Sequence, residues 1–123
     1  MSPPYPMNDE QLVIGLVGPC TSGKSLLKDA LHKRDYQVRH IAQEHSFMKD
    51  MWQRYVAPDV LIFLDVSYPI TLKRRNMDWT EKDYEEQQRR LEHARKHADF
   101  YLDTDNISPG EVLKNTLVFL RTA

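Results

Sequence analysis

An apolar run that ends in a glycine-rich loop and leads into a helix does most to restrict the fold of this 123-residue chain. Residues 11–17, QLVIGLV, are apolar without alternation, which predicts a strand buried on both faces of a parallel sheet. Gly18 and Pro19 close the run, and apolar side chains recur at helical spacing over residues 24–33. A buried strand followed at once by a helix is typical of a βα unit, whose next strand lies parallel to the first.

The same alternation continues to the end of the chain. The periodicity of the sequence predicts further strands over residues 36–42, 59–67 and 99–103, and helices over 45–55, 69–75, 81–97 and from 108 onward. Thr80 with Asp83, and Ser108 with Glu111, have the spacing of capping boxes and predict where the last two helices begin. The order βαβαβααβα predicts the α/β class, as a three-layer α/β/α sandwich around a small parallel sheet.

Length and composition predict one domain over residues 11–123, preceded by a flexible tail over residues 1–10 that holds three prolines. A formal net charge of −1 speaks against a nucleic-acid partner, because proteins that bind the phosphate backbone carry a basic excess. Cys20 is the only cysteine, which fits a reducing compartment, and no apolar run approaches the ~20 residues that span a bilayer. We therefore expect a cytoplasmic protein without a membrane partner.

The loop GPCTSGKS, residues 18–25, fits the pattern G-x-x-x-x-G-K-[ST] without a mismatch. In this pattern, glycines let backbone amides wrap around a phosphate, and the following helix aims its positive N-terminus at the same anion. Lys24 can reach the β- and γ-phosphates, and the Ser25 hydroxyl suits a Mg²⁺ ion. A simple turn needs no Lys-Ser pair, so the loop predicts a nucleotide site. The residues expected to contact the nucleotide are Gly18, Thr21, Ser22, Gly23, Lys24, Ser25 and Leu26.

Three longer stretches resemble the P-loop nucleotide and nucleoside kinases, in the branch of adenylate kinase and dephospho-coenzyme A kinase. PDVLIFLDVSYPITLKRR resembles the late strand of that family, which ends in Asp and continues into a helix closed by arginine. DYEEQQRRLEHARKHADFYLDTD resembles its arginine-bearing lid helix and the strand that follows, and SPGEVLKNTLVFL resembles its closing helix. The resemblance covers nearly all of the chain after the tail.

The resemblance implies a P-loop NTPase fold, ATP and Mg²⁺ as cofactors, and transfer of the γ-phosphoryl group to a small metabolite. It implies catalytic roles for Lys24 and for arginines of a lid-like region around residues 74–97, with Arg75 and Arg89 the chosen candidates beside Arg74 and Arg90. Residues 104–108 match the loop that lies beside the adenine in that family. Arginines suit this role because the transition state spreads negative charge over the equatorial oxygens.

The sequence departs from that family between the second strand and residue 58, where only some sixteen residues remain. The family has there an acceptor-binding insertion and a further strand that ends in the acid organising Mg²⁺. Two acids are candidates to replace it as general base or Mg²⁺ contact. Glu44 follows the second strand, which could lie directly beside the loop, and Asp65 ends the strongest strand. We favour Glu44 slightly, and Asp65 stays its rival.

Several other residues have plainer interpretations. His40 and His45 flank Glu44, but strand geometry would place these side chains on different faces, which favours surface histidines over metal ligands. Cys20 has no evident charged partner and is not expected to act as a nucleophile. Of the two tryptophans, Trp52 fits a core position and Trp79 is the candidate for stacking on a base.

The missing insertion leaves two other functions open. One is a nucleotide-binding sensor or partner module with little or no turnover, and the other is a slow NTPase. A homodimer could complete an acceptor site from two chains, although no surface in the sequence indicates where the chains would pair.

Overall fold

A computed structural model, which describes residues 12–76 and 78–122, contains one parallel sheet of four strands. The strand order across the sheet is β2-β1-β3-β4, and every neighbouring pair is parallel. The inner strands are apolar because helices cover both of their faces, and all residues of β3 are buried. The strands are β1 Val13–Val17, β2 Gln37–His40, β3 Val60–Asp65 and β4 Phe100–Asp103.

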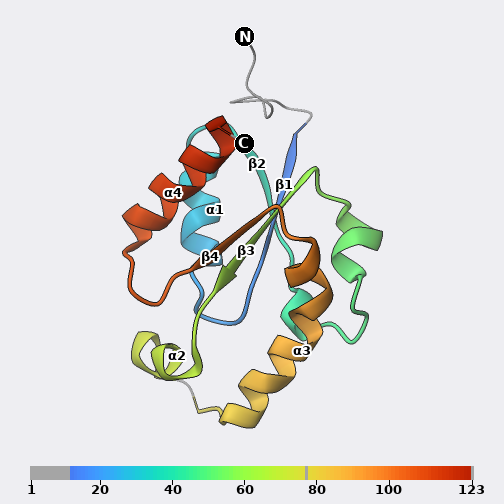
Figure 1. Cartoon of the computed structure of the whole chain (residues 1–123), viewed down its shortest axis with the longest axis vertical. Helices are drawn as coiled ribbons and strands as arrows, with labels where there is room; N and C mark the ends of the chain where they lie inside the picture. Colours follow the sequence, from blue (N-terminus) through green and yellow to red (C-terminus); the bar gives the residue numbers. More distant parts are fainter. Residues whose placement is uncertain (1–11, 77, 123) are drawn as a thin grey trace.

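Helices lie on both faces of the sheet, and the arrangement is compatible with the expected three-layer α/β/α sandwich (Figure 1). On one face, α1 (Lys24–His32) and α4 (Pro109–Thr122) pack over a cluster that includes Ile14 and Ile62. On the other face, α3 (Glu81–His97) packs over a second cluster that includes Phe63. The α/β class and the parallel sheet are thus confirmed.

Both predicted capping boxes are present at the starts of the last two helices. Thr80 and Asp83 exchange side-chain to backbone hydrogen bonds at the start of α3. Ser108 and Glu111 do the same at α4. These reciprocal bonds satisfy amides that a helix start otherwise leaves without acceptors.

The predicted helix over residues 45–55 is wrong for most of its length. The chain forms a single 3₁₀ turn, η1 (Gln43–His45), and a short π-helical segment, η2 (Trp52–Val56). The buried Gln43 accounts for the difference, because its amide accepts from Trp52 N and donates to the carbonyl of Met48. Of the predicted apolar stripe, Trp52 is buried in the core as expected, whereas Phe47 is 88% exposed.

The lid-like region has two parts in the structure. The short α2 (Tyr68–Arg74) lies at the carboxyl end of the sheet, where Figure 1 places it below β3 and β4. The later half of α3 belongs to the core, because Leu91 and Ala94 are fully buried. The tail over residues 1–10, and Met77 in the lid-like region, lie outside the described residues. Across the described part of the chain, every helix is too short or too polar to cross a bilayer.

Candidate functional site

The loop between β1 and α1 bends back through backbone conformations that favour glycine. Gly18 and Gly23 have φ values of 155° and 100°, and Thr21 also has a positive φ of 69°. A Cβ on Gly18 would lie 2.0 Å from the carbonyl oxygen of Leu64 in β3, so this position has no room for any side chain. The loop therefore packs tightly against β3, and the first amides of α1 face the space above it without intrahelical acceptors.

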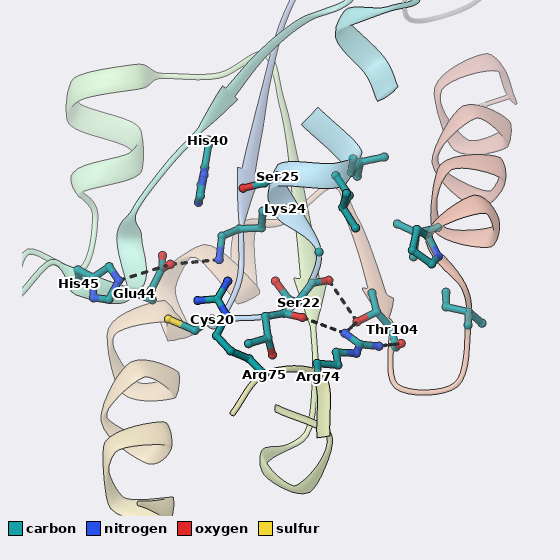
Figure 2. Close-up of a pocket in the computed structure, with 17 residues that line it drawn as sticks. Cys20, Ser22, Lys24, Ser25, His40, Glu44, His45, Arg74, Arg75 and Thr104 are labelled. Carbon is teal, nitrogen blue, oxygen red and sulfur yellow. Dashed lines mark hydrogen bonds and ion pairs between the residues drawn. The ribbon is translucent and has the colours of Figure 1, made fainter. Parts of the chain in front are cut away.

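Lys24, the first residue of α1, directs its buried side chain back under the loop. Its Nζ donates to the carbonyl of Gly18 at 2.5 Å, to that of Pro19 at 3.1 Å and to Glu44 Oε2 at 3.1 Å. An ammonium has three protons, so these three acceptors satisfy it. Figure 2 shows Lys24 and Glu44 pointing toward one another across the loop.

Glu44 reaches this position because β2 pairs directly with β1. The sequence left open whether the second strand lies beside the loop, and the register of Leu16 with His40 shows that it does. The chain then turns through η1, which carries the Glu44 carboxyl group to the loop with only 4% of its side chain exposed. Its Oε2 contacts Lys24, while its buried Oε1 has no hydrogen-bond partner among the described residues.

A cavity of about 640 Å³ opens above the loop, within the size range of small-molecule sites. One end is polar and holds the loop, Lys24 and Glu44, and the other end is apolar. Its lining residues are Cys20, Thr21, Ser22, Gly23, Lys24, Ser25, Leu26, Leu27, His40, Glu44, His45, Arg74, Arg75, Thr104, Ile107, Pro109 and Val112. Apart from Gly18, the first residue of the loop, all the residues predicted to contact a nucleotide line the cavity.

Two hydroxyl groups in the loop are buried without a hydrogen-bond partner in the described part of the chain. They are Thr21 Oγ1 and Ser22 Oγ. A buried polar group without a partner is costly, and native structures keep few of them. Two of them beside a cavity and a helix N-terminus indicate a place where a polar ligand completes the hydrogen bonding. Ser25, the second residue of α1, is exposed and lines the cavity, where its hydroxyl can contact a ligand or an ion.

The predicted arginines divide between the cavity and the outer surface. Arg74 and Arg75 line the cavity. Arg74 braces the loop, because it donates to the carbonyl of Thr21 and to both the hydroxyl and the carbonyl of Thr104. Arg89 instead pairs with Glu86 on the exposed side of α3 and does not line the cavity.

Asp65 also lies away from the cavity, although it ends the strand beside the loop. Its carboxylate accepts hydrogen bonds from Tyr101, Arg95, Gln88 and the amide of Val66. Burial, together with the hydrogen bond to this carboxylate, raises the pKa of Tyr101. Asp65 therefore ties α3 to β4 in a satisfied polar network, and of the two candidate acids only Glu44 meets the loop. Trp79 likewise lies outside the cavity lining, where it donates to Thr71 and packs on Tyr68.

No family model matches this sequence, and no curated protein matches it either.

Two residues hold the loop in place in a role that sequence reasoning did not assign, although Thr104 begins the stretch 104–108 that was matched to the loop beside the adenine. Gln87 of α3 accepts from the amide of Cys20 and donates to its sulfur, so the loop is fixed to the second helical layer. Thr104 follows β4, and its single hydroxyl proton is directed to the carbonyl of Asp65 at 2.8 Å, with the carbonyl of Ser22 as the second acceptor at 3.2 Å. Gln87 lies among charged residues on α3, and Thr104 lies in a polar loop, so neither pattern distinguishes it from a surface residue.

The surroundings of Glu44 differ from the expectation in one respect. Strand geometry was expected to separate His45 from Glu44, but both lie in a 3₁₀ turn, and His45 Nε2 is 3.9 Å from Glu44 Oε2. Cys20 also lies close to this pair. Desolvation, and then the charge of Lys24, lowers the pKa of His40 nearby. The polar end of the cavity thus holds one buried carboxylate among cationic, imidazole and thiol groups.

Proposed function

We propose that this chain is a small P-loop NTPase of the nucleotide kinase type, which binds Mg·ATP and transfers the γ-phosphoryl group to a small metabolite. The observation that carries the proposal is the set of unsatisfied polar groups around the loop. Thr21 Oγ1, Ser22 Oγ and the first amides of α1 all need a partner at the polar end of one cavity. A phosphate group supplies acceptor oxygens for donors of these kinds.

The apolar end of the cavity suits the base of the nucleotide. Leu26, Ile107 and Val112 line it from α1, the loop after β4 and α4. A nucleotide that extends from this end toward Lys24 would place its base on apolar side chains and its phosphates on the loop. The expectation for residues 104–108 beside the adenine agrees with this direction.

The residues present fit a Mg²⁺ ion. Mg²⁺ prefers oxygen ligands and keeps several of its waters. Ser25 offers an exposed hydroxyl at the cavity, and Glu44 offers a buried carboxylate oxygen without a partner. These two residues would hold the ion, directly or through water, and the ion would neutralise charge on the phosphates.

Phosphoryl transfer on this site would depend mainly on positioning and on charge. Lys24 would leave its loop carbonyls to contact the β- and γ-phosphates, and Arg75 would face the transferred group from the other wall. Glu44, the one acid among the described residues that line the cavity, would then be released from Lys24 and, as the alternative to holding the ion, would accept the proton of the acceptor hydroxyl.

A nucleotide-binding module without turnover is the second candidate, and the segment between β2 and β3 favours it. That segment forms only η1, η2 and their connection, and η1 packs against α3. It contributes Glu44 and His45 to the cavity lining and no separate acceptor wall.

Titration with Mg·ATP, followed by measurement of ADP formation, tests both candidates. We expect Lys24→Ala to weaken ATP binding about 10–100-fold, the equivalent of the ~1.5–3 kcal/mol of a charge-assisted hydrogen bond. Lys33→Ala, at the far end of α1, is the matched control. Since Lys24→Ala leaves Glu44 buried and unpaired, the double variant Lys24→Met with Glu44→Gln gives the same test without the stranded charge. Retained affinity in both variants would refute the phosphate site.

A panel of nucleosides, nucleotides and coenzyme precursors then separates the candidates. ADP formation that depends on an acceptor supports the kinase. ADP formation without any acceptor indicates a slow NTPase, and tight binding without turnover indicates the module.

A further inference from the structure

Three different metal-binding side chains meet at the edge of the cavity. Cys20 comes from the loop, and Glu44 and His45 come from η1, on the two sides of the β1–β2 boundary. One ligand atom from each lies within 4.8 Å of the others, and all three residues line the cavity (Figure 2). We infer that Cys20, Glu44 and His45 form a site for one transition-metal ion of the zinc class.

The donor set selects the class of ion. A thiolate, an imidazole and a carboxylate suit Zn²⁺ and its neighbours, whereas Mg²⁺ and Ca²⁺ prefer oxygen alone. With ligand bonds of about 2.0–2.3 Å, tetrahedral geometry places the donor atoms about 3.3–3.8 Å apart, so the most widely separated pair would approach by up to about 1 Å. His45 can supply this movement, because 61% of its side chain is exposed.

An independent observation at Glu44 points to a missing partner. Its Oε2 is engaged by Lys24, but its Oε1 is buried and accepts nothing among the described residues. The side chain is only 4% exposed, so water does not reach it freely. His45 Nε2 lies 3.9 Å from Oε2. An ion held between Cys20 and His45 would therefore reach Oε1 after a rotation of the carboxyl group, and it would then give Oε1 its partner while Lys24 keeps Oε2.

The neighbours of Cys20 suit a metal-bound sulfur. Gln87 Nε2 donates to Cys20 Sγ at 3.2 Å, which is the kind of outer contact that fixes the direction of a metal ligand. Lys24 adds one positive charge nearby, and the thiolate and the carboxylate together offset that charge and half of the charge of a divalent ion. The site with the ion bound therefore keeps about one net positive charge.

Three protein ligands leave one position of a tetrahedral ion open, as in catalytic rather than structural zinc sites. Since all three ligands line the cavity, that position opens into it. The ion would also occupy the carboxylate that the proposed phosphoryl transfer needs, so it would inhibit that reaction. The metal site itself does not depend on the proposed function.

Titration of the nucleotide-free protein with Co²⁺, followed by competition with Zn²⁺, tests the site. Because Cys20 is the only cysteine in the chain, any thiolate-to-cobalt absorption band reports this residue alone. We expect the band in the unmutated protein and its loss in Cys20→Ser. We expect His45→Ala to weaken Zn²⁺ binding at least 10-fold, the lower end of the roughly 10–100-fold cost of losing an outer partner.

The control is a histidine pair away from the proposed site, His93 and His97, whose ring centroids lie 4.3 Å apart on α3. His97→Ala should leave both the band and the affinity unchanged. Loss of affinity in His97→Ala, or a cobalt complex without the thiolate band, would overturn the site. A measurement on the unmutated protein guards against misfolded variants: Zn²⁺ should slow alkylation of Cys20, and an unchanged rate would also overturn it.

Discussion

Lys24 and Glu44 form a buried ion pair across the β1–β2 boundary, with Nζ 3.1 Å from Oε2 and with 5% and 4% of their side chains exposed. The lysine also donates to two loop carbonyls, so the pair joins the loop to η1 at the polar end of the cavity. Under the proposed function, a phosphate that enters would compete with the carboxylate for Lys24. The pair would then couple the occupancy of the loop to the freedom of Glu44.

Glu44→Gln is expected to separate binding from chemistry. The amide keeps a hydrogen bond to Lys24 but removes the competing charge, so ATP binding should be retained or become tighter while turnover falls. Titration calorimetry and a single-turnover assay measure the two effects. Glu92→Gln, on the exposed side of α3, is the control. Unchanged turnover in Glu44→Gln would remove this residue from the role of general base.

Glu44→Ala should cost more stability than Glu44→Gln, because it leaves the Lys24 charge without a counter-ion. Breaking a buried ion pair costs about 3–5 kcal/mol, and we expect the lower end here since two carbonyls still accept from Lys24. Urea unfolding gives the difference directly. Equal stability of the two variants would show that the ammonium is satisfied by the carbonyls alone.

Gly18→Ala and Gly23→Ala form a matched pair that tests the loop. At Gly23 the added methyl meets nothing within 4 Å, so only the left-handed backbone is strained, at about 1–2 kcal/mol. At Gly18 it would press on the carbonyl of Leu64 in β3, and we expect a loss of about 3 kcal/mol or more. Thermal unfolding ranks the two variants, and a larger loss at Gly23 would contradict the packing of the loop on β3.

Most of the fold could be predicted from the sequence because burial on two faces leaves a clear pattern. The unbroken apolar run of β3 and the two capping boxes mark elements whose local preferences agree with their packing. The helix over 45–55 failed because one buried amide, that of Gln43, binds the backbone of residues 48 and 52. A contact of this kind leaves no periodic signal.

The candidate site was predictable where it is contiguous in sequence and unpredictable where it depends on strand order. The loop residues follow one another, so spacing alone identified them. Whether Glu44 or Asp65 meets the loop depends on which strand pairs with β1 and on which side of the sheet each carboxylate points. The strand before Glu44, β2, and the strand that ends in Asp65, β3, both pair with β1. The Asp65 side chain nevertheless points to Arg95 of α3 and to Tyr101. Arg89 likewise faces outward on a helix whose rotation the sequence left uncertain.

Asp65→Asn should lower stability without changing nucleotide binding. The variant loses the charge that Arg95 and Tyr101 share, and hydrogen bonds to a charged group contribute about 1.5–3 kcal/mol each. We expect a loss near the lower value, because a third of the Arg95 side chain is exposed. Urea unfolding and ATP titration of the same sample measure both quantities. Weakened ATP binding at unchanged stability would instead make Asp65 part of the site.

We expect the lowered pKa of His40, which lines the cavity, to make the stability of the fold depend on pH. Desolvation and the charge of Lys24 lower the pKa of His40, so the folded state favours the neutral ring. The unfolded chain then binds the proton first as the pH falls below about 6.5, and the free energy of unfolding decreases until the lowered pKa is passed. We expect His40→Asn to lose this part of the acid sensitivity in urea unfolding between pH 7 and pH 5. In Lys24→Met the His40 pKa, followed by NMR of the ring, should move back toward its ordinary value. A His40 pKa that does not move in Lys24→Met would show that the charge of Lys24 does not contribute to the shift.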